Sequence, residues 1–483
     1  MPAAATPVQQ VQLFGVGTKA ISPAITAQRR INLYVETRRE GEKTKFALVG
    51  RPGLVEFANT LAANPTRGMW AVNTLSQPLL FVVQAATVYA INNAGAVTAI
   101  GTLNTTIGDV SMVDDGTYLM IVDGDYGYYY NMVTAAGIVQ ITDGNFTTSP
   151  VYCTWQDTYF IVVSGATNQF QLSDNGTPIT WPAVNINFSG ASPGALRVGI
   201  SDHSILNLFG EVYTEYWQNA GSPDFPFAAI PGSSQEFGLA TAWSLAKFDN
   251  ALVGLFKNRM GGINISRMSG FALKRLSDGD IEDAIATYGA QINDAKGFSV
   301  QWGGHPVYIL NFLAAGQTWM YDGDTGIWSE LQGYSENFRG AKFALFVNRL
   351  CIADRSTGAI YQFSTEAFED AGDPLVREVW TRRIWNNNRY IGINWIQIDV
   401  ESGTGTISGQ GANPVLDLQV SKDGGNTFYS VGYSSIGEIG HYTQRVFWSS
   451  LGAARDWVLK LRITDPAKIV ITNAVAQMVG GPF

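Results

Sequence analysis

A short apolar run recurs seven times, and this repetition constrains the fold more than any other feature of the chain. The runs begin 39, 41, 46, 46, 56 and 43 residues apart. They are residues 79–83 (LLFVV), 118–122 (YLMIV), 159–163 (YFIVV), 205–209 (ILNLF), 251–255 (ALVGL), 307–311 (VYILN) and 350–354 (LCIAD). One four-stranded propeller blade occupies roughly 40–45 residues, and each blade must pack on its neighbours to bury its faces. The runs therefore predict a repeated β scaffold.

A second shared element supports this interpretation. An aromatic segment begins about ten residues after each run begins, as in 128–130 (YYY) and 318–321 (TWMY). Clusters such as 92–95 (NNAG) and 322–326 (DGDTG) follow, and Asn and Gly supply the positive φ of tight hairpins. We expect an all-β fold with a β-propeller of about seven blades over residues 51–372. The strand at 54–57 can be shared with the last unit to close the ring.

The remaining segments predict the other parts of the chain. Residues 1–50 contain no repeat unit and are expected to form an N-terminal extended arm and strand. A helical insertion is expected near 278–290, because Ile281, Ala284, Ile285 and Tyr288 fall on one helical face. That helix would pack on the rim of a blade or dock a partner. Residues 373–483 have longer strands and predict a C-terminal β-sandwich domain.

Composition restricts the class of function. Charged residues make up 15% of the chain, which also has 13 Trp, 20 Tyr and 25 Phe. This composition favours contact with other subunits, although a large all-β protein also needs aromatic residues in its strands. The net charge of −9 argues against an open nucleic-acid-binding surface but is compatible with a channel in which DNA slides.

The cysteines and the N-terminal sequence indicate in which cellular compartment the protein is made. Cys153 and Cys351 lie in or beside expected strands, which indicates buried free thiols and no disulfide framework. The sequence MPAAA at the start lacks the regions of a signal peptide. No apolar stretch approaches the ~20 residues of a membrane-spanning helix. We therefore expect no membrane insertion by this chain.

Catalytic and metal signatures are weak. His203, His305 and His441 are far apart, without metal-ligand spacing, and no Gly-x-Ser-x-Gly motif follows an apolar strand. Residues 421–428 (SKDGGNTF) resemble the Asp-box of sialidases, a structural turn that occurs here once. Residues 123–127 and 322–326 are Asp-x-Asp-x-Gly fragments that more often form hairpin turns than calcium loops. We expect no catalytic, cofactor-binding or metal-binding residues, no cofactor, and no enzyme activity.

A cluster of basic and aromatic residues opens the tail. Arg382, Arg383 and Arg389 are interleaved with Trp380, Trp385 and Tyr390. Such residues can stack on nucleic acid, and they are also enriched at subunit interfaces. In a chain of net negative charge, we favour the protein interface.

The sequence resembles the tail-hub proteins of short-tailed phages, also called packaged-DNA stabilisation proteins. The matching segments are 30–34 (RINLY), 50–54 (GRPGL), 398–405 (IDVESGTG), 416–424 (LDLQVSKDG), 445–448 (RVFW) and 459–464 (LKLRIT). The resemblance implies a homo-oligomeric ring, with six copies expected, in the tail of a virion assembled in the host cytoplasm. Its implied partners are the portal-adaptor protein, the tail needle or spike proteins, and double-stranded DNA that passes without sequence-specific binding.

Three hypotheses of function follow. The first is a structural hub (nozzle) that extends the DNA channel below the portal and adaptor rings, helps retain packaged DNA and connects to needle or spikes. The second is a propeller glycosidase or glycan-binding protein acting on the bacterial surface, which requires placed carboxylates that no pattern nominates. The third, a generic interaction propeller, is separated from the first by the resemblance alone.

Overall fold

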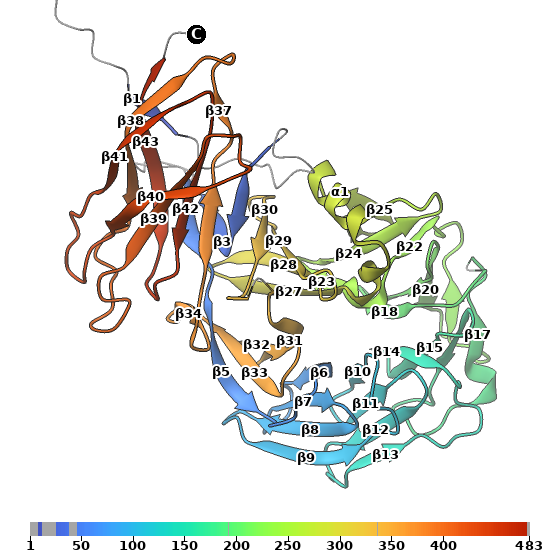
Figure 1. Ribbon diagram of the computed structural model, residues 1–483. Helices are drawn as coiled ribbons and strands as arrows, with labels where there is room; N and C mark the ends of the chain where they lie inside the picture. The colour runs from blue at the N-terminus through green and yellow to red at the C-terminus, as the bar shows by residue number, and fades with distance from the viewer. Residues whose placement is uncertain (1–7, 12–25, 38–45, 192, 336, 481–483) are drawn as a thin grey trace, which may run out of the picture.

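Seven sheets arranged around a common centre form a β-propeller, and a β-sandwich lies against one side of it (Figure 1). The computed structural model describes residues 8–11, 26–37, 46–191, 193–335 and 337–480. Blade one contains β6 (Thr66–Val72), β7 (Leu79–Gln84), β8 (Thr87–Asn92) and β9 (Val97–Thr102), and blade two contains β10 (Ser111–Asp114), β11 (Tyr118–Val122), β12 (Gly127–Asn131) and β13 (Ile138–Gln140). Blade three contains β14 (Pro150–Gln156), β15 (Tyr159–Ser164), β16 (Gln169–Leu172) and β17 (Ile186–Phe188). Blade four contains β18 (Val198–Asp202), β19 (Ile205–Phe209), β20 (Thr214–Asn219) and β21 (Phe227–Ala229).

Blades five to seven follow the same order with local variations. Blade five contains β22 (Phe237–Leu239), β23 (Ala246–Phe248), β24 (Ala251–Asn258), β25 (Ile263–Ser269) and β26 (Ala272–Arg275). Blade six contains β27 (Lys296–Trp302), β28 (His305–Phe312), β29 (Gln317–Asp322) and β30 (Trp328–Leu331). Blade seven contains β31 (Gly340–Phe346), β32 (Arg349–Asp354), β33 (Ala359–Ser364) and β5 (Gly53–Asn59). The N-terminal strand β5 is the outermost strand of blade seven, where Leu54 pairs with Phe363. The ring therefore closes with a strand from the start of the propeller sequence.

Each apolar run forms the second strand of a blade. These strands are buried along nearly their whole length, as β7, β11, β15 and β19 show. A second strand has a neighbour in the sheet on each side, and its two faces pack on the two adjacent blades. Both faces are therefore apolar, which explains why the runs are continuous instead of alternating. The propeller predicted from these runs is confirmed.

The longest repeat spacing corresponds to α1 (Gly279–Tyr288) and a following 3-10 turn, Gly289–Asp294, between blades five and six. Asp278 caps the helix by accepting a hydrogen bond from the Ile281 amide at 3.0 Å. Ile281 and Ile285 are buried against the core between blades five and six, and Ala284 and Tyr288 pack beside them. The helix lies on the rim of the propeller (Figure 1).

The sandwich is built from both ends of the chain. One sheet contains β3 (Leu33–Thr37), β4 (Phe46–Gly50), β43 (Val470–Gly480), β38 (Ile391–Val400) and β41 (Val446–Ala454), with β1 (Val8–Gln10) also on β43. The other contains β36 (Arg377–Trp380), β42 (Asp456–Ile463), β39 (Val415–Ser421) and β40 (Tyr429–Ser435), with β37 (Ile384–Trp385) also on β42. Within residues 1–50, for which the sequence predicts an extended arm and a strand, the structure has three strands, β1, β3 and β4, that complete this sandwich. Residues 1–7, 12–25 and 38–45 of this segment lie outside the described residues.

One short strand joins the two domains. β2 (Arg29–Ile31) pairs in parallel with β30 of blade six and antiparallel with β36 of the sandwich. Blade six and the sandwich sheet therefore form one continuous hydrogen-bonded sheet. A small hairpin, β34 (Glu369–Asp370) and β35 (Asp373–Pro374), attaches to β5 of blade seven.

Two further sequence expectations concern thiols and membranes. Cys153 and Cys351 are buried and free, and burial raises the pKa of each thiol to about 12. Within the described residues, no helix has the length and apolar character needed to span a membrane.

Candidate assembly surface and the junction that positions it

A charged cluster lies at the centre of the propeller, among the inner strands of the blades. Asp109 lies just before β10, and its carboxylate contacts the ammonium groups of Lys296 at 2.5 Å and Lys342 at 2.9 Å. Lys296 begins the inner strand of blade six, and Lys342 lies in the inner strand of blade seven. Burial lowers the pKa of Lys342 to about 8 despite the nearby carboxylate. Burial would raise the pKa of Asp109, but the two lysines hold it below its usual value.

An interruption in blade five places an aromatic ring beside this cluster. The 3-10 turn Ala242–Ser244 separates β22 from β23, and Trp243 within it lies 4.0 Å from the Lys342 ammonium, measured to the ring centroid. Tyr152 of blade three lies 5.7 Å from the same indole. The remaining cavity measures about 140 Å³, the space of roughly five water molecules. A DNA duplex cannot pass along the axis of this propeller.

Paired charges fasten β2 at the junction between the domains. Arg29 forms two hydrogen bonds of 2.6 Å with the carboxylate of Glu330 at the outer edge of blade six. Arg30 is buried and donates to the Trp328 carbonyl at 2.8 Å. Burial lowers the pKa of Arg30 to about 10, although Glu330 and Asp278 favour its charged form. Both strand pairing and side chains therefore hold β2 to the propeller.

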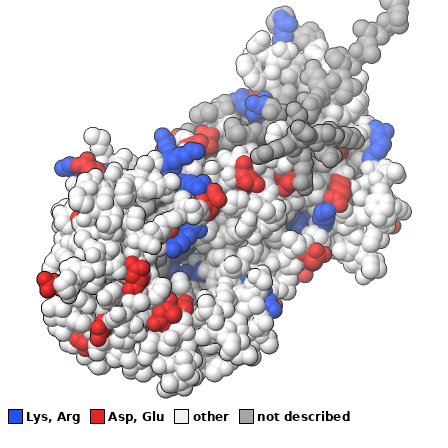
Figure 2. Space-filling view, turned by 180° about the vertical axis from the view of Figure 1, so that it is seen from behind, with Lys and Arg blue, Asp and Glu red and all other residues white. Residues whose placement is uncertain are grey.

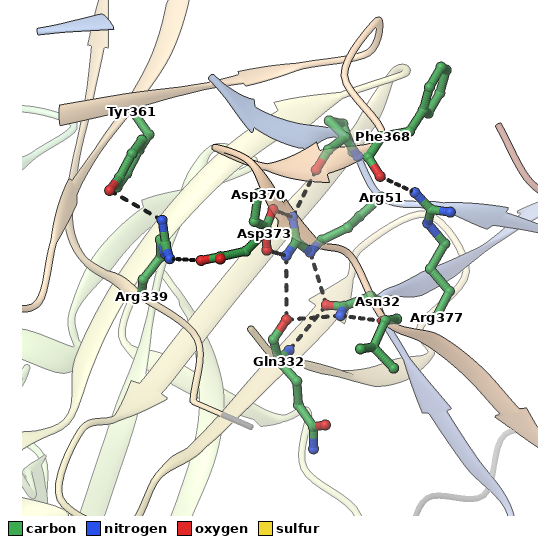
Figure 3. Close-up of polar contacts among 11 residues, drawn as sticks. Asn32, Arg51, Gln332, Arg339, Tyr361, Phe368, Asp370, Asp373 and Arg377 are labelled. Carbon is green, nitrogen blue, oxygen red and sulfur yellow. Dashed lines mark hydrogen bonds and ion pairs between the residues drawn. The ribbon is translucent and has the colours of Figure 1, made fainter. Parts of the chain in front are cut away.

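A buried polar centre lies where the chain passes from the sandwich into the propeller (Figure 3). Arg51 and Asp370 form a two-pronged ion pair at 2.5 and 3.0 Å, and their side chains are 0% and 1% exposed. Asn32 adopts φ 54° and donates to the carbonyls of Gln332 and Val376 at 2.9 and 2.6 Å. Its side-chain oxygen accepts from Arg51 at 2.9 Å. Asn tolerates this backbone conformation better than most residues, and its side-chain amide donates hydrogen bonds to carbonyls of both domains.

Two more arginines flank this centre. Arg377 of β36 donates to the carbonyls of Phe368 at 2.7 Å and Ala467 at 3.0 Å, and burial and the charge of Arg51 lower its pKa to about 10. Arg339 pairs with Asp373 and donates to the Tyr361 hydroxyl at 3.2 Å (Figure 3). Carbonyl groups of the turns between the domains thus accept hydrogen bonds from charged donors, which gives a rigid connection.

His305 forms a third contact between the domains. Its Nδ1 lies 3.0 Å from Asp322 of blade six, and its Nε2 lies 2.7 Å from Glu36 of β3. Burial alone would lower the pKa of His305, but the hydrogen bonds to Glu36 and Asp322 raise it above its ordinary value. His203 and His441 lie elsewhere, on exposed segments. The three histidines are therefore not brought together.

The sandwich carries a positively charged groove next to β37. We call it the basic-aromatic groove; it is lined by Thr26, Arg382, Arg383, Trp385, Asn387, Asn388, Arg455 and Asp456 and has a volume of about 700 Å³. Arg383 pairs with Asp456, the one acidic residue in this lining. Arg455 lies 4.8 Å from the ring of Tyr390. Trp385 is 63% exposed.

Only part of the cluster expected from the sequence meets in this groove. Arg382, Arg383 and Trp385 line it, with Tyr390 beneath Arg455, but Trp380 packs on Phe428, with centroids 4.6 Å apart. Arg29 and Lys460 lie over the Trp380 ring at 5.6 and 5.3 Å. Arg389 is not in the lining. Sequence reasoning missed Arg455, because strand pairing alone brings β42 beside β37.

The turn motifs are structural. Asp423 accepts hydrogen bonds from the amides of Asn426 and Thr427, each at 3.0 Å, and from the Ser421 hydroxyl at 2.6 Å. The bonds from Ser421 and Thr427 hold the pKa of Asp423 far below its usual value. Asp123 and Asp322 likewise accept hydrogen bonds from amides within their own turns. Among the described residues, no three His, Cys, Asp or Glu side chains are grouped as metal ligands would be.

A β-propeller followed by a β-sandwich, with a buried polar junction between them, defines the architectural class of this protein. Two family models match in that order: "Bacteriophage P22 Gp10, beta-propeller" over residues 9–367 and "Bacteriophage P22 Gp10, beta-sandwich" over residues 376–479. The chain belongs to the bacteriophage P22 Gp10 family, the DNA-stabilisation and tail-hub proteins of the virion. The resemblance noted in the sequence is thereby confirmed.

Other comparisons concern solved structures and curated proteins. Virginiamycin B lyase from Staphylococcus aureus aligns with a TM-score of 0.44 and 11% identity, over 64% of this chain and 98% of its own. The WD40 propeller domain of Doa1 aligns with a TM-score of 0.41 and 10% identity, over 65% and 97% of the two chains. No curated protein matches this chain.

Proposed function

We propose that this chain forms the hub of a phage tail: a ring of six copies that extends the DNA channel below the portal and adaptor rings and helps retain packaged DNA. The observation that carries this proposal is the match of both family models in sequence order. The rigid junction supports it, because a chain that bears load between unlike rings needs domains in a fixed orientation.

The narrow propeller centre supports a conduit that runs between copies. Asp109, Lys296, Lys342 and Trp243 lie around a central cavity of only about 140 Å³. We further propose that the inner wall of the ring is net negative, because the chain carries a charge of −9. Figure 2 shows a sparsely charged surface: most of this face is neither acidic nor basic, and both acidic and basic residues occur on it. A wall of Lys and Arg would bind phosphates by releasing counterions and would slow ejection.

The role is mechanical and not enzymatic. Ring subunits would present complementary surfaces to the portal-adaptor protein above and to the needle or spike proteins below. DNA would pass without base contacts, and the needle would block its exit until infection. Purified protein is therefore expected to leave bacterial surface glycans uncleaved, which separates this function from the glycosidase alternative.

The test is a reconstruction of the assembled particle together with a DNA-retention assay. We expect several copies around a channel lined mainly by neutral and acidic side chains, and DNA loss from particles assembled without this chain. A single copy per tail, or a channel lined mainly by Lys and Arg, would contradict the proposal.

A further inference from the structure

The basic-aromatic groove has more positive than negative charge. Arg382, Arg383 and Arg455 contribute three guanidinium groups, and Asp456 is already paired with Arg383. Within the described part of the chain, no carboxylate pairs with Arg382, and Arg455 has the Tyr390 ring as its contact. The exposed indole of Trp385 adds apolar surface beside these charges. Arg and Trp in a concave site are typical of an anchor for a partner protein.

The chain's own N-terminal segment lacks the charge to complete this groove. Thr26 is part of the lining, so the preceding residues join the chain at this place. Residues 1–25 contain no Asp and no Glu, and Lys19 is their one charged side chain. A matching occupant must bring carboxylates from elsewhere.

The N-terminal end of α1 has two carboxylates without partners. The side chains of Asp280, in the first turn, and Asp283, at the start of the second, form no ion pair or hydrogen bond within the described residues, whereas Glu282 pairs with Arg275. Asp283 is exposed. Burial and the charges of Asp278 and Asp283 raise the pKa of Asp280, so a cation beside this turn would relieve the repulsion. The helix α1 is on the propeller, and β37, which lies beside the groove, is on the sandwich (Figure 1).

We propose that the basic-aromatic groove of one copy binds the N-terminal end of α1 from a neighbouring copy. Asp280 and Asp283 would pair with Arg382 and Arg455, and Trp385 would cover the side of the helix. One turn of a helix with its side chains occupies roughly 500 Å³, and the groove has a volume of about 700 Å³. The two surfaces differ, so the contact is head-to-tail and repeats around a closed ring. This inference rests on the proposed ring and specifies one of its contacts.

Cross-linking between two different variants tests the contact directly. Chains carrying Arg382→Cys and chains carrying Asp283→Cys are co-assembled into tails and treated with a short bismaleimide. The native Cys153 and Cys351 are buried and do not compete. We expect a covalent dimer in the mixture and none when either variant assembles alone. Val184→Cys, at a site 70% exposed on blade three, replaces Asp283→Cys as the matched control and is expected to give no dimer with Arg382→Cys.

Charge reversal supplies an independent readout. Arg382→Glu with Arg455→Glu, and separately Asp280→Lys with Asp283→Lys, are each expected to reduce incorporation into tails by about tenfold or more. Combining all four substitutions should restore incorporation to within about twofold of wild type. Thermal unfolding of each purified chain verifies folding.

The possible results separate the two proposals. Multi-copy tails without the covalent dimer, or charge-reversed chains that assemble at the wild-type level, would overturn the groove contact and leave the ring intact. Wild-type tails with a single copy would overturn the ring itself. A groove variant that assembles normally but loses DNA would show that the groove binds nucleic acid instead and would also overturn this inference.

Discussion

Asp109 connects the two lysines of the charged cluster at the propeller centre. It neutralises two ammonium groups that face a small cavity and an indole ring. Removal of the shared carboxylate leaves two like charges with little water to solvate them. Charged pairs of this kind contribute little net stability when intact but are costly to break.

Asp109→Asn is expected to lower the free energy of unfolding by about 3 kcal/mol. The double variant Asp109→Asn with Lys342→Met should recover most of that loss, because Lys342 is the ammonium whose pKa is reduced to about 8 by burial. Denaturant unfolding of the wild type, both single variants and the double variant measures the coupling. If the double variant lost as much stability as the two single variants added together, the role assigned to Asp109 would be contradicted.

His305 makes the contact between β3 and blade six depend on pH. Its pKa in the folded protein is above the ordinary value of 6.5, so the folded state binds the proton more tightly than the unfolded state. The stabilisation is therefore complete below about pH 6.5 and is lost as the pH rises through the folded pKa. Tyr34, 5.3 Å from the imidazole, has its pKa raised to about 12 by burial and does not titrate in that range.

His305→Gln should accordingly flatten the fall in stability between pH 6 and pH 9. Denaturant unfolding of the wild type and of His305→Gln at several pH values gives the comparison. Parallel curves for the two proteins would show that His305 does not titrate with folding.

At the scale of the element, the junction between the domains is built from buried polar groups. Arg51 bridges Asp370 and Asn32, and β2 links blade six to the sandwich. These contacts join residues about 300 positions apart, such as Ile31 and Glu330. The orientation of the domains therefore depends on buried hydrogen bonds more than on the turn-rich segment 364–374.

Arg51→Met is expected to lower the free energy of unfolding by about 3–5 kcal/mol, because it leaves Asp370 buried without a counter-charge. Arg339→Met is the matched control: its partner Asp373 is 47% exposed, so the loss should stay within about 1 kcal/mol. Denaturant unfolding and limited proteolysis of segment 364–374 report both effects. Similar losses in the two variants would show that burial does not decide the strength of these pairs.

Sequence reasoning succeeded for the elements whose signal is local. The second strands of the blades are apolar on both faces, so their period is visible in the sequence, and the spacing of Ile281 and Ile285 indicates a helical face. The places of β2, β3 and β4 could not be predicted in this way. β2 and β4 pair with strands hundreds of positions away, and no local pattern specifies such a partner. β3 pairs with the nearby β4 and joins the sandwich sheet through it. The groove was only half predicted for a similar reason, because Arg455 lies in the turn between β41 and β42, far from Arg382 in the sequence.

At the scale of the whole molecule, the two ends of the chain share one sandwich. β43 lies between β38 on one side and β4 and β1 on the other. Leu33, Val35 and Leu48 of the N-terminal strands are at most 2% exposed in the sandwich core. The sandwich cannot bury its apolar face without residues that precede the propeller in sequence, so the two domains must fold in a coordinated way.

Residues 376–483 expressed alone are therefore expected to aggregate, because the eleven-residue strand β43 becomes an exposed edge beside an uncovered core. A rearranged chain, 376–483 followed directly by 1–50, should be soluble and fold. Val8 pairs with Gln477 in an antiparallel register, so the end of β43 lies beside the start of β1, and residues 481–483 and 1–7 provide the connection. Size-exclusion chromatography and thermal unfolding compare these two chains. If residues 376–483 alone were monomeric and unfolded cooperatively, the N-terminal strands would not be needed for the sandwich to fold. Any coupling between the folding of the sandwich and that of the propeller would then have to come from β2 alone.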